Sequence, residues 1–350
     1  MQVKTSMENH DPLGELLKQF NSDDVSTQPV AMLQRLISER WDDLPFPGQG
    51  DTLFRWQRLS LVASYDLSLA KMFEGHTDAL AILEELRAPI ARPGSSWAVW
   101  GADPAEARVT VTPLLEGSKL EHLCEVRLDG IKAWCSGAEG LTNALLTVRD
   151  NHGLLYLAAV DLPQEGIKIN AANWKAVGMH GTSSVDVEFT NASGRIVGRA
   201  GAYLERPGFW YGGAGVAACW YGAAAALGQY MRKGFVRSSD PHFMAHLGAV
   251  DVALQGARAT LHEVARSLDA APGKCALSMA LQARLQVEKA ATEVISHVGR
   301  ALGARPFCRD ARFARLMADL PVFIRQSHAE RDLAFLGNRV LEDAALPWSL

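Results

Sequence analysis

The sequence has few cysteines, no long apolar run and no excess of positive charge. Its 350 residues include 35 Lys and Arg against 39 Asp and Glu, a formal net charge of −4. Nucleic-acid-binding proteins need a basic surface to neutralise phosphates, so this balance argues against nucleic acid as a partner. With 48% hydrophobic and 21% charged residues, the composition is that of an ordinary globular protein with enough apolar material for a sizeable core.

The five cysteines are widely scattered, and no two of them have the C-x-x-C spacing of a zinc knuckle or a redox dithiol. We interpret them as buried free thiols in a reducing compartment. The first ten residues contain no apolar segment of the kind found in signal peptides. The most apolar stretch, from Val216 to Leu227, is too short to span a bilayer. We therefore expect a cytoplasmic protein with no metal site and no membrane-spanning helix.

The hydrophobic pattern changes twice along the chain. From about Leu13 to Leu86, apolar residues recur at steps of three and four, which is typical of helices. Between about Ala91 and Pro207 they alternate with polar residues, as in strands. Helical spacing then returns and continues to the end. We predict an α+β protein with an N-terminal α-helical domain (1–92), a middle β domain (93–205) and a C-terminal helical bundle (206–350).

A two-residue turn is predicted at Asp129-Gly130, because this dipeptide suits the positive φ angles of a type I′ hairpin. The following strand would place Lys132, Trp134 and Ser136 on one face of the sheet. An aromatic ring beside a hydroxyl group suits a flat heteroaromatic ligand. The alternative is that Trp134 only fills the space between the sheet and the helices.

Four short segments follow one another in the order of a known protein family. They are Ala63-Ser-Tyr-Asp-Leu-Ser-Leu-Ala70 with His76, Gly130-Ile-Lys-Ala-Trp-Cys-Ser136, Gly178-Met-His-Gly181 before an alternating strand, and Gly299 and Gly303 before Arg309-Asp310-Ala311. In these segments the sequence resembles the acyl-CoA dehydrogenase flavoproteins. The resemblance implies a helical domain, a β-barrel-like domain and a four-helix bundle, assembled as a homodimer or homotetramer that binds FAD.

The resemblance also implies roles for individual residues. Trp134 would line the isoalloxazine ring, and Ser136 would form a hydrogen bond near its N5 atom. Trp100 stands at the end of the first flavin strand, where the family has a small hydroxyl residue, and the glycine-rich turn that follows in the family is absent. The remaining cofactor-binding candidates are Phe243 and Arg237, near the pyrophosphate of a neighbouring subunit, and Gly299 near the end of its helix.

The family needs a carboxylate base to remove the α-proton of its substrate. Its usual Glu corresponds to Ala318 here, and the alternative position on the first bundle helix corresponds to Gly212-Gly213. Asp319, one residue further on, is the candidate catalytic residue. It could instead be the N-cap of a helix that begins at Pro321.

Three other polar residues could contact a ligand or face solvent. His328 and Glu330 lie on a charged helix and are interpreted as surface residues. His180 either contacts flavin or substrate, or faces solvent from its turn.

We expect an FAD-dependent oxidoreductase that introduces an α,β double bond into a small acyl thioester and passes electrons to an acceptor protein or to O₂. One alternative is a flavin-dependent monooxygenase on the same fold. The other is a non-catalytic member that binds flavin or an acyl group.

Overall fold

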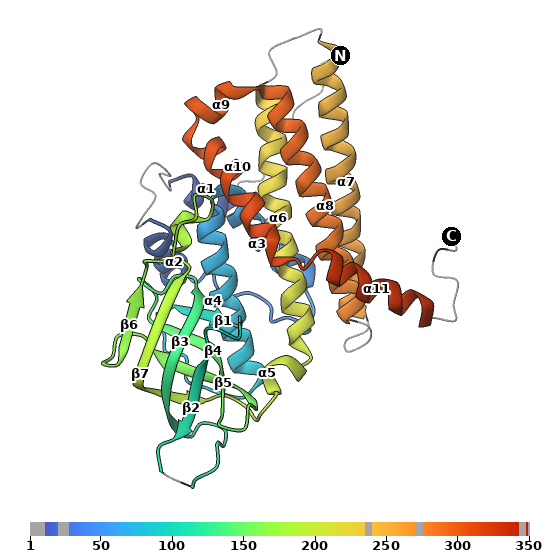
Figure 1. Cartoon of the computed structure of the whole chain (residues 1–350). Coiled ribbons are helices and arrows are strands. Elements are labelled where there is room, and N and C mark those ends of the chain that lie inside the picture. Colours follow the sequence, from blue (N-terminus) through green and yellow to red (C-terminus); the bar gives the residue numbers. More distant parts are fainter. Residues whose placement is uncertain are drawn as a thin grey trace.

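The computed structural model describes residues 11–19, 28–115, 117–234, 240–270, 276–342 and 348. It has helices at both ends of the chain and a sheet between them (Figure 1). This helix–sheet–helix order confirms the predicted fold class. The predicted domain bounds stay predictions. The N-terminal helices are α1 (Pro12–Lys18), α2 (Gln28–Ser38), α3 (Thr52–Tyr65) and α4 (Leu67–Glu85).

The strands form one sheet that closes on itself. They are β1 (Trp97–Trp100), β2 (Val109–Pro113), β3 (Glu125–Cys135), β4 (Asn143–Arg149), β5 (Leu155–Asp161), β6 (Ile167–Asn170) and β7 (Val185–Ile196). The order is β1-β4-β2-β3-β7-β5, and β5 also pairs with β4, which completes a ring. The predicted β-barrel-like arrangement is thus present.

The predicted hairpin at Asp129-Gly130 is wrong, because β3 continues through this dipeptide as one strand. Gly130 has φ +126°, and the register of β3 against β7 shifts between Leu128 and Gly130. A Cβ at Gly130 would lie 2.2 Å from the carbonyl oxygen of Arg108. The glycine therefore serves a bulge, where positive φ and close backbone contact are needed as they are in a turn.

A second bulge turns Trp134 away from the core. Three steps of β3, from Lys132 to Cys135, match two steps of β7, and Trp134 has φ +62°. Lys132 is fully buried, and its Nζ donates to the carbonyl oxygen and Oγ1 of Thr147 at 2.7 and 2.6 Å. The side chain of Trp134, in contrast, is 63% exposed. The prediction that Lys132 and Trp134 share a face is wrong, and so is the alternative that Trp134 fills the core.

The C-terminal part is a bundle in which α6, α7 and α8 run side by side (Figure 1). Its helices are α5 (Ala202–Glu205), α6 (Gly208–Lys233), α7 (Pro241–Ala270), α8 (Ala276–Leu302), α9 (Ala304–Arg309), α10 (Ala311–Phe323) and α11 (Glu330–Glu342). Among the described residues, each helix is too short or too polar to cross a membrane.

The N-terminal helices and the sheet meet at α4. His76, on α4, is 1% exposed and accepts a hydrogen bond at Nδ1 from the backbone N–H of Trp97 at 3.2 Å. Its Nε2 lies 3.1 Å from a carboxylate oxygen of Asp42 and therefore carries the proton. This histidine fixes the start of β1 against α4.

The described cysteines are free thiols, as expected, but burial varies among them. Cys135 and Cys219 are buried, Cys124 is half-buried and Cys308 is exposed, whereas Cys275 lies outside the described residues. The prediction that these thiols are buried is therefore wrong for Cys308.

Helices α3 and α6 are in backbone contact at Gly222. A Cβ at this position would lie 2.1 Å from the carbonyl oxygen of Ser60, which cannot move without shifting α3. We expect Gly222→Ala to lower the free energy of unfolding by roughly 1–3 kcal/mol through overpacking. Gly248, in α7, is the matched control, because a Cβ there meets nothing within 4 Å. Gly248→Ala should raise stability by about 0.5–1 kcal/mol. Chemical denaturation measures both, and equal effects would contradict the prediction.

Candidate functional site

Asp319 joins α10 to the barrel. Its side chain is 2% exposed and accepts a short hydrogen bond from the backbone N–H of Met179. A Cβ at Gly178 would lie 2.0 Å from the carbonyl oxygen of Ala318, so only glycine permits this approach. Burial raises the pKa of Asp319 to about 7. This position gives Asp319 a structural role, and its catalytic role stays a prediction.

The helix that contains Asp319 begins earlier than expected. Asp310 is the N-cap of α10, and its carboxylate accepts from the backbone N–H of Phe313 at 2.9 Å. Pro321 lies inside the same helix. The alternative in which Asp319 caps a helix starting at Pro321 is therefore wrong.

Three hydroxyl groups connect this contact to the strand that carries Trp134. Thr182 Oγ1 donates to the carbonyl oxygen of Met179 at 2.8 Å, Ser184 Oγ lies 2.8 Å from Thr182 Oγ1, and Ser136 Oγ lies 2.7 Å from Ser184 Oγ. We refer to Thr182, Ser184 and Ser136 as the hydroxyl chain. Trp100, 2% exposed, donates from Nε1 to the carbonyl oxygen of Ser136 at 3.1 Å. The structure thus brings Asp319, Ser136 and Trp100 into one network.

Phe243 and Gly299 lie apart from this network. Phe243 is in α7 and packs, partly buried, against the core. Gly299 is in α8, where a Cβ would meet Phe307 and Met317. Arg237 lies outside the described residues. His180 is exposed, with its Nδ1 3.3 Å from the carbonyl oxygen of Ala176.

A cavity of about 340 Å³ lies where α4, the end of β1, α6 and the C-terminal helices meet. We call it the α4–α6 cavity. Val99 and Gly101, the neighbours of Trp100, line it, and so do Gly212 and Gly213 of α6. Its polar lining comes from four segments of the chain. These residues are Lys71, Glu74, Asp78, Tyr203, Arg206, Arg284, His328, Arg331 and Asp332.

Most charged groups deep in this cavity have partners. Lys71 Nζ lies 3.0 Å from Glu74, and Arg206 lies 2.9 Å from Glu85. Arg284 donates to the carbonyl oxygens of Gly213 and Gln326, both at 2.8 Å. These contacts hold α4, α6 and α8 around the cavity.

Asp78 is the exception. Its side chain is 14% exposed, and among the described residues it forms an ion pair with Arg206 at 3.7 Å, beyond hydrogen-bond distance. Oδ1 is shielded from solvent and accepts no hydrogen bond from the described residues. Burial raises the pKa of Asp78, and Arg206 opposes this shift. A shielded carboxylate oxygen without a hydrogen-bond donor is unusual and suggests a functional position.

Sequence reasoning did not identify this cavity. Lys71, Glu74 and Asp78 stand at steps of three and four within the largely apolar segment from Leu67 to Leu83, and this spacing was the available signal. His328 was interpreted as a surface residue. It is exposed, as expected, but its side chain also lines the cavity.

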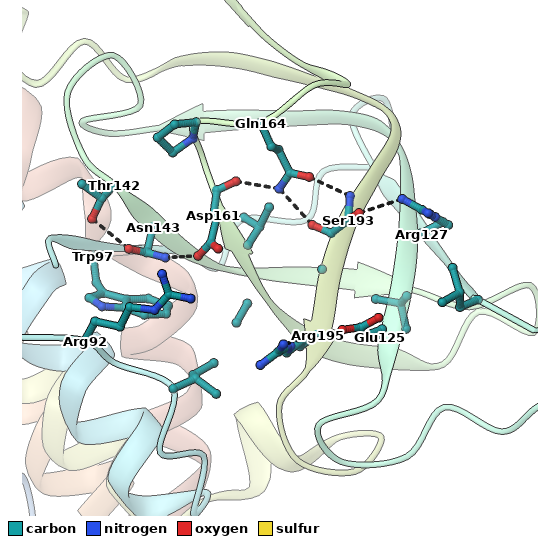
Figure 2. A pocket seen from close by; sticks show the side chains of 17 residues that line it. Arg92, Trp97, Glu125, Arg127, Thr142, Asn143, Asp161, Gln164, Ser193 and Arg195 are labelled. Atoms are coloured by element: carbon teal, nitrogen blue, oxygen red, sulfur yellow. Dashed lines mark hydrogen bonds and ion pairs between the residues drawn. The ribbon is translucent and has the colours of Figure 1, made fainter.

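Two larger cavities lie elsewhere in the part of the chain that the structure describes. One, of about 890 Å³, lies between α3, α6 and α7. The other, of about 530 Å³, lies on the barrel (Figure 2). Its polar side chains contact one another: Arg127 donates to Ser193 at 2.7 Å, and Arg195 lies 3.5 Å from Glu125 (Figure 2). None of the predicted site residues lines it.

No protein-family model and no curated protein matches the sequence. Solved structures match over nearly the whole chain. TdsC from a Paenibacillus species, solved with FMN and indole, has a TM-score of 0.76 at 19% identity, covering 94% of this chain and 96% of that one. The chain has an acyl-CoA dehydrogenase-like fold.

Two further solved structures are similar to this chain over nearly its whole length. Methanesulfinate monooxygenase MsuC from Pseudomonas fluorescens has a TM-score of 0.75 at 20% identity, covering 95% of this chain and 97% of that one. KijD3, solved with FMN and dTDP-3-amino-2,3,6-trideoxy-4-keto-3-methyl-D-glucose, has a TM-score of 0.79 at 19% identity, covering 95% and 92%. At these identities the likeness establishes the fold alone.

The structural role of Asp319 can be measured through pH. In the folded chain the Asp319 carboxyl keeps its proton up to about pH 7. In the unfolded chain the same carboxyl loses its proton near its ordinary pKa of 3.8. Stability contributed by this group therefore falls as pH rises between these values. Asp319→Asn keeps an acceptor for Met179 and has no proton to lose. Its stability relative to wild type should increase by about 2 kcal/mol between about pH 5 and pH 8. A stability difference independent of pH would contradict this.

Proposed function

We propose that this chain is a flavin-dependent monooxygenase rather than a thioester dehydrogenase. The observation that carries the proposal is the course of α10. This helix continues through Ala318 and Asp319 to Phe323, and it buries Asp319 against Met179. The position where the family has its base therefore offers no free carboxylate to accept an α-proton. Oxygenation by reduced flavin requires no such base.

The exposed strand around Trp134 fits a flavin. A tryptophan with φ +62° is strained, and 63% exposure of its side chain costs free energy unless something covers it. The isoalloxazine ring would lie on this indole, with the hydroxyl chain at its edge. A bound, reduced flavin would supply the electrons that activate O₂.

The α4–α6 cavity is the proposed substrate site. β1 connects it to the flavin-facing strand, because Trp100 contacts Ser136 while its neighbours Val99 and Gly101 line the cavity. Arg284 fixes the position of Gly213, and Arg206 fixes the start of α6 through Glu85, which also accepts from the backbone N–H of Gly208 at 2.7 Å.

The flavin that we propose for this chain is FMN. TdsC and KijD3 were solved with FMN, which supports FMN, whereas the sequence resemblance pointed to FAD. Titration with each flavin decides between them. The homodimer or homotetramer stays a prediction.

We expect purified protein to bind a flavin, and Trp134→Ala to weaken its Kd by about tenfold, since aromatic stacking contributes roughly 1 kcal/mol. Trp348→Ala is the matched control, because Trp348 is also exposed, at 83%. Flavin fluorescence quenching measures both. A protein that takes up neither FMN nor FAD would leave only the non-catalytic alternative.

The reaction class is tested by mixing the flavin-loaded protein anaerobically with a panel of acyl-CoA thioesters. A monooxygenase leaves the flavin band unchanged, and it consumes O₂ only after an added reductase has bleached the flavin. Bleaching by a thioester would support dehydrogenation instead.

Dehydrogenation has one structural argument in its favour. A Cβ at Gly212 would lie 2.7 Å from Asp78 Oδ1, so Asp78 places a carboxylate beside the position where some members of the family have their base. If the chain were a dehydrogenase with Asp78 as its base, Asp78→Asn would abolish the bleaching of the flavin by any thioester that bleaches the wild type.

A blocking variant tests the cavity itself. A Cβ at Gly213 meets nothing within 4 Å, although Gly213 lines the cavity, so a side chain there extends into open space. Gly213→Leu should fill the cavity and reduce substrate-dependent O₂ consumption at least tenfold, with flavin binding unchanged. Gly248→Leu, in α7, is the control. Full turnover in Gly213→Leu would place the substrate elsewhere.

A further inference from the structure

The charged groups that line the α4–α6 cavity indicate which kind of ligand it favours, because some of them already have partners within the protein. Lys71 is paired with Glu74, Arg206 with Glu85, and Arg284 with two carbonyl oxygens. Asp78 accepts no hydrogen bond from the described residues, and Arg206 reaches it only at 3.7 Å. Nε of Arg206 also lacks a hydrogen-bond partner, but Asp78 is the charged group deep in the cavity whose carboxylate forms no hydrogen bond with the described residues at either oxygen.

The geometry of Asp78 points to the cavity as the source of that partner. Oδ1 is shielded beside Gly212, as is Nε of Arg206, so neither atom meets a ligand directly. Oδ2 is not shielded in this way, and the side chain lines the cavity. A ligand that enters between Val99 and Gly213 would meet this second oxygen.

We propose that the cavity selects a substrate with a primary amino group, which donates hydrogen bonds to the carboxylate of Asp78. This inference rests on the proposed function, in which the cavity is the substrate site. The apolar lining from Val99, Trp210 and Leu281 would surround the carbon skeleton of the substrate.

An amine suits this position better than an alcohol or an anion. A protonated amine offers several donors and a positive charge, and its hydrogen bonds to a carboxylate are about twice as strong as neutral ones. An alcohol offers one neutral donor. An anion would be repelled by Asp78. The cation also compensates the desolvation of the carboxylate, so the two charged forms stabilise each other.

The test uses benzylamine and benzyl alcohol, which have the same ring and differ in the donor group. Ligand-observed NMR gives the Kd of each with the full chain, before and after flavin loading. We expect wild type to bind benzylamine at least about tenfold more tightly than benzyl alcohol. This comparison needs no variant. Equal affinities, or a preference for the alcohol, would overturn the proposal.

Two variants test whether Asp78 causes the preference for the amine. Asp78→Asn keeps the shape of the side chain and should reduce the ratio of the two affinities to near one. Glu205→Gln is the control, because it removes a negative charge that pairs with exposed Arg199 at 2.6 Å, outside the cavity lining. A ratio that persists in Asp78→Asn would contradict the role of Asp78.

The same experiment separates this inference from the proposed function. Gly213→Leu should abolish the binding of both probes if the cavity receives them. Binding that Gly213→Leu removes, without a preference for the amine, would make the substrate class wrong and leave the cavity as the site. Failure to take up flavin would refute the proposed function, whatever the probes show.

Discussion

The contact between α10 and the turn at Gly178 joins the C-terminal helices to the barrel on the side that presents Trp134. It requires a residue without a Cβ at 178, a buried carboxyl at Asp319 and a free backbone N–H at Met179. From Met179 the hydroxyl chain continues to Ser136, where Trp100 donates to the backbone. The strand that presents Trp134 is thus linked to α10 through this chain of contacts. Burial of the carboxyl in a neutral form at low pH makes this contact sensitive to pH.

Periodicity predicted most of the elements, because alternation and helical spacing record which face of an element is buried. The stripe from Leu281 to Leu302 lies within α8, and the strands around Leu146 and Ala158 are buried as expected. The local errors are at Gly130 and Trp134. A glycine with positive φ serves a turn and a bulge equally well, and only the register against β7 decides between them. That register is not encoded in the neighbouring residues.

The residues of the candidate site likewise fall into those that the sequence could indicate and those that it could not. Ser136 could be selected as a candidate because a contiguous segment carries the resemblance, and Trp100 because the sequence departs there from the family pattern. Asp78 could not, because a charged residue in a helix is normally solvated. It is buried here because α4 lies between the sheet and α6, a fact of packing between segments more than a hundred residues apart. Asp319 was singled out for its charge and sequence position, whereas its contacts give it a structural role.

Several features that cost stability converge on the α4–α6 cavity. Adjacent glycines at 212 and 213 weaken α6 by about 1 kcal/mol each relative to alanine. Gly212 leaves room for the carboxylate of Asp78, and Gly213 leaves open space. Oδ1 of Asp78 is also shielded from water without a hydrogen-bond donor, which lowers the stability of the fold further. By contrast, the contact at Asp319 satisfies a buried acceptor and fills its space. A fold selected for stability alone would close the cavity with alanines and pair the carboxylate, so an open space beside an unpaired carboxylate is better explained by a ligand that it receives.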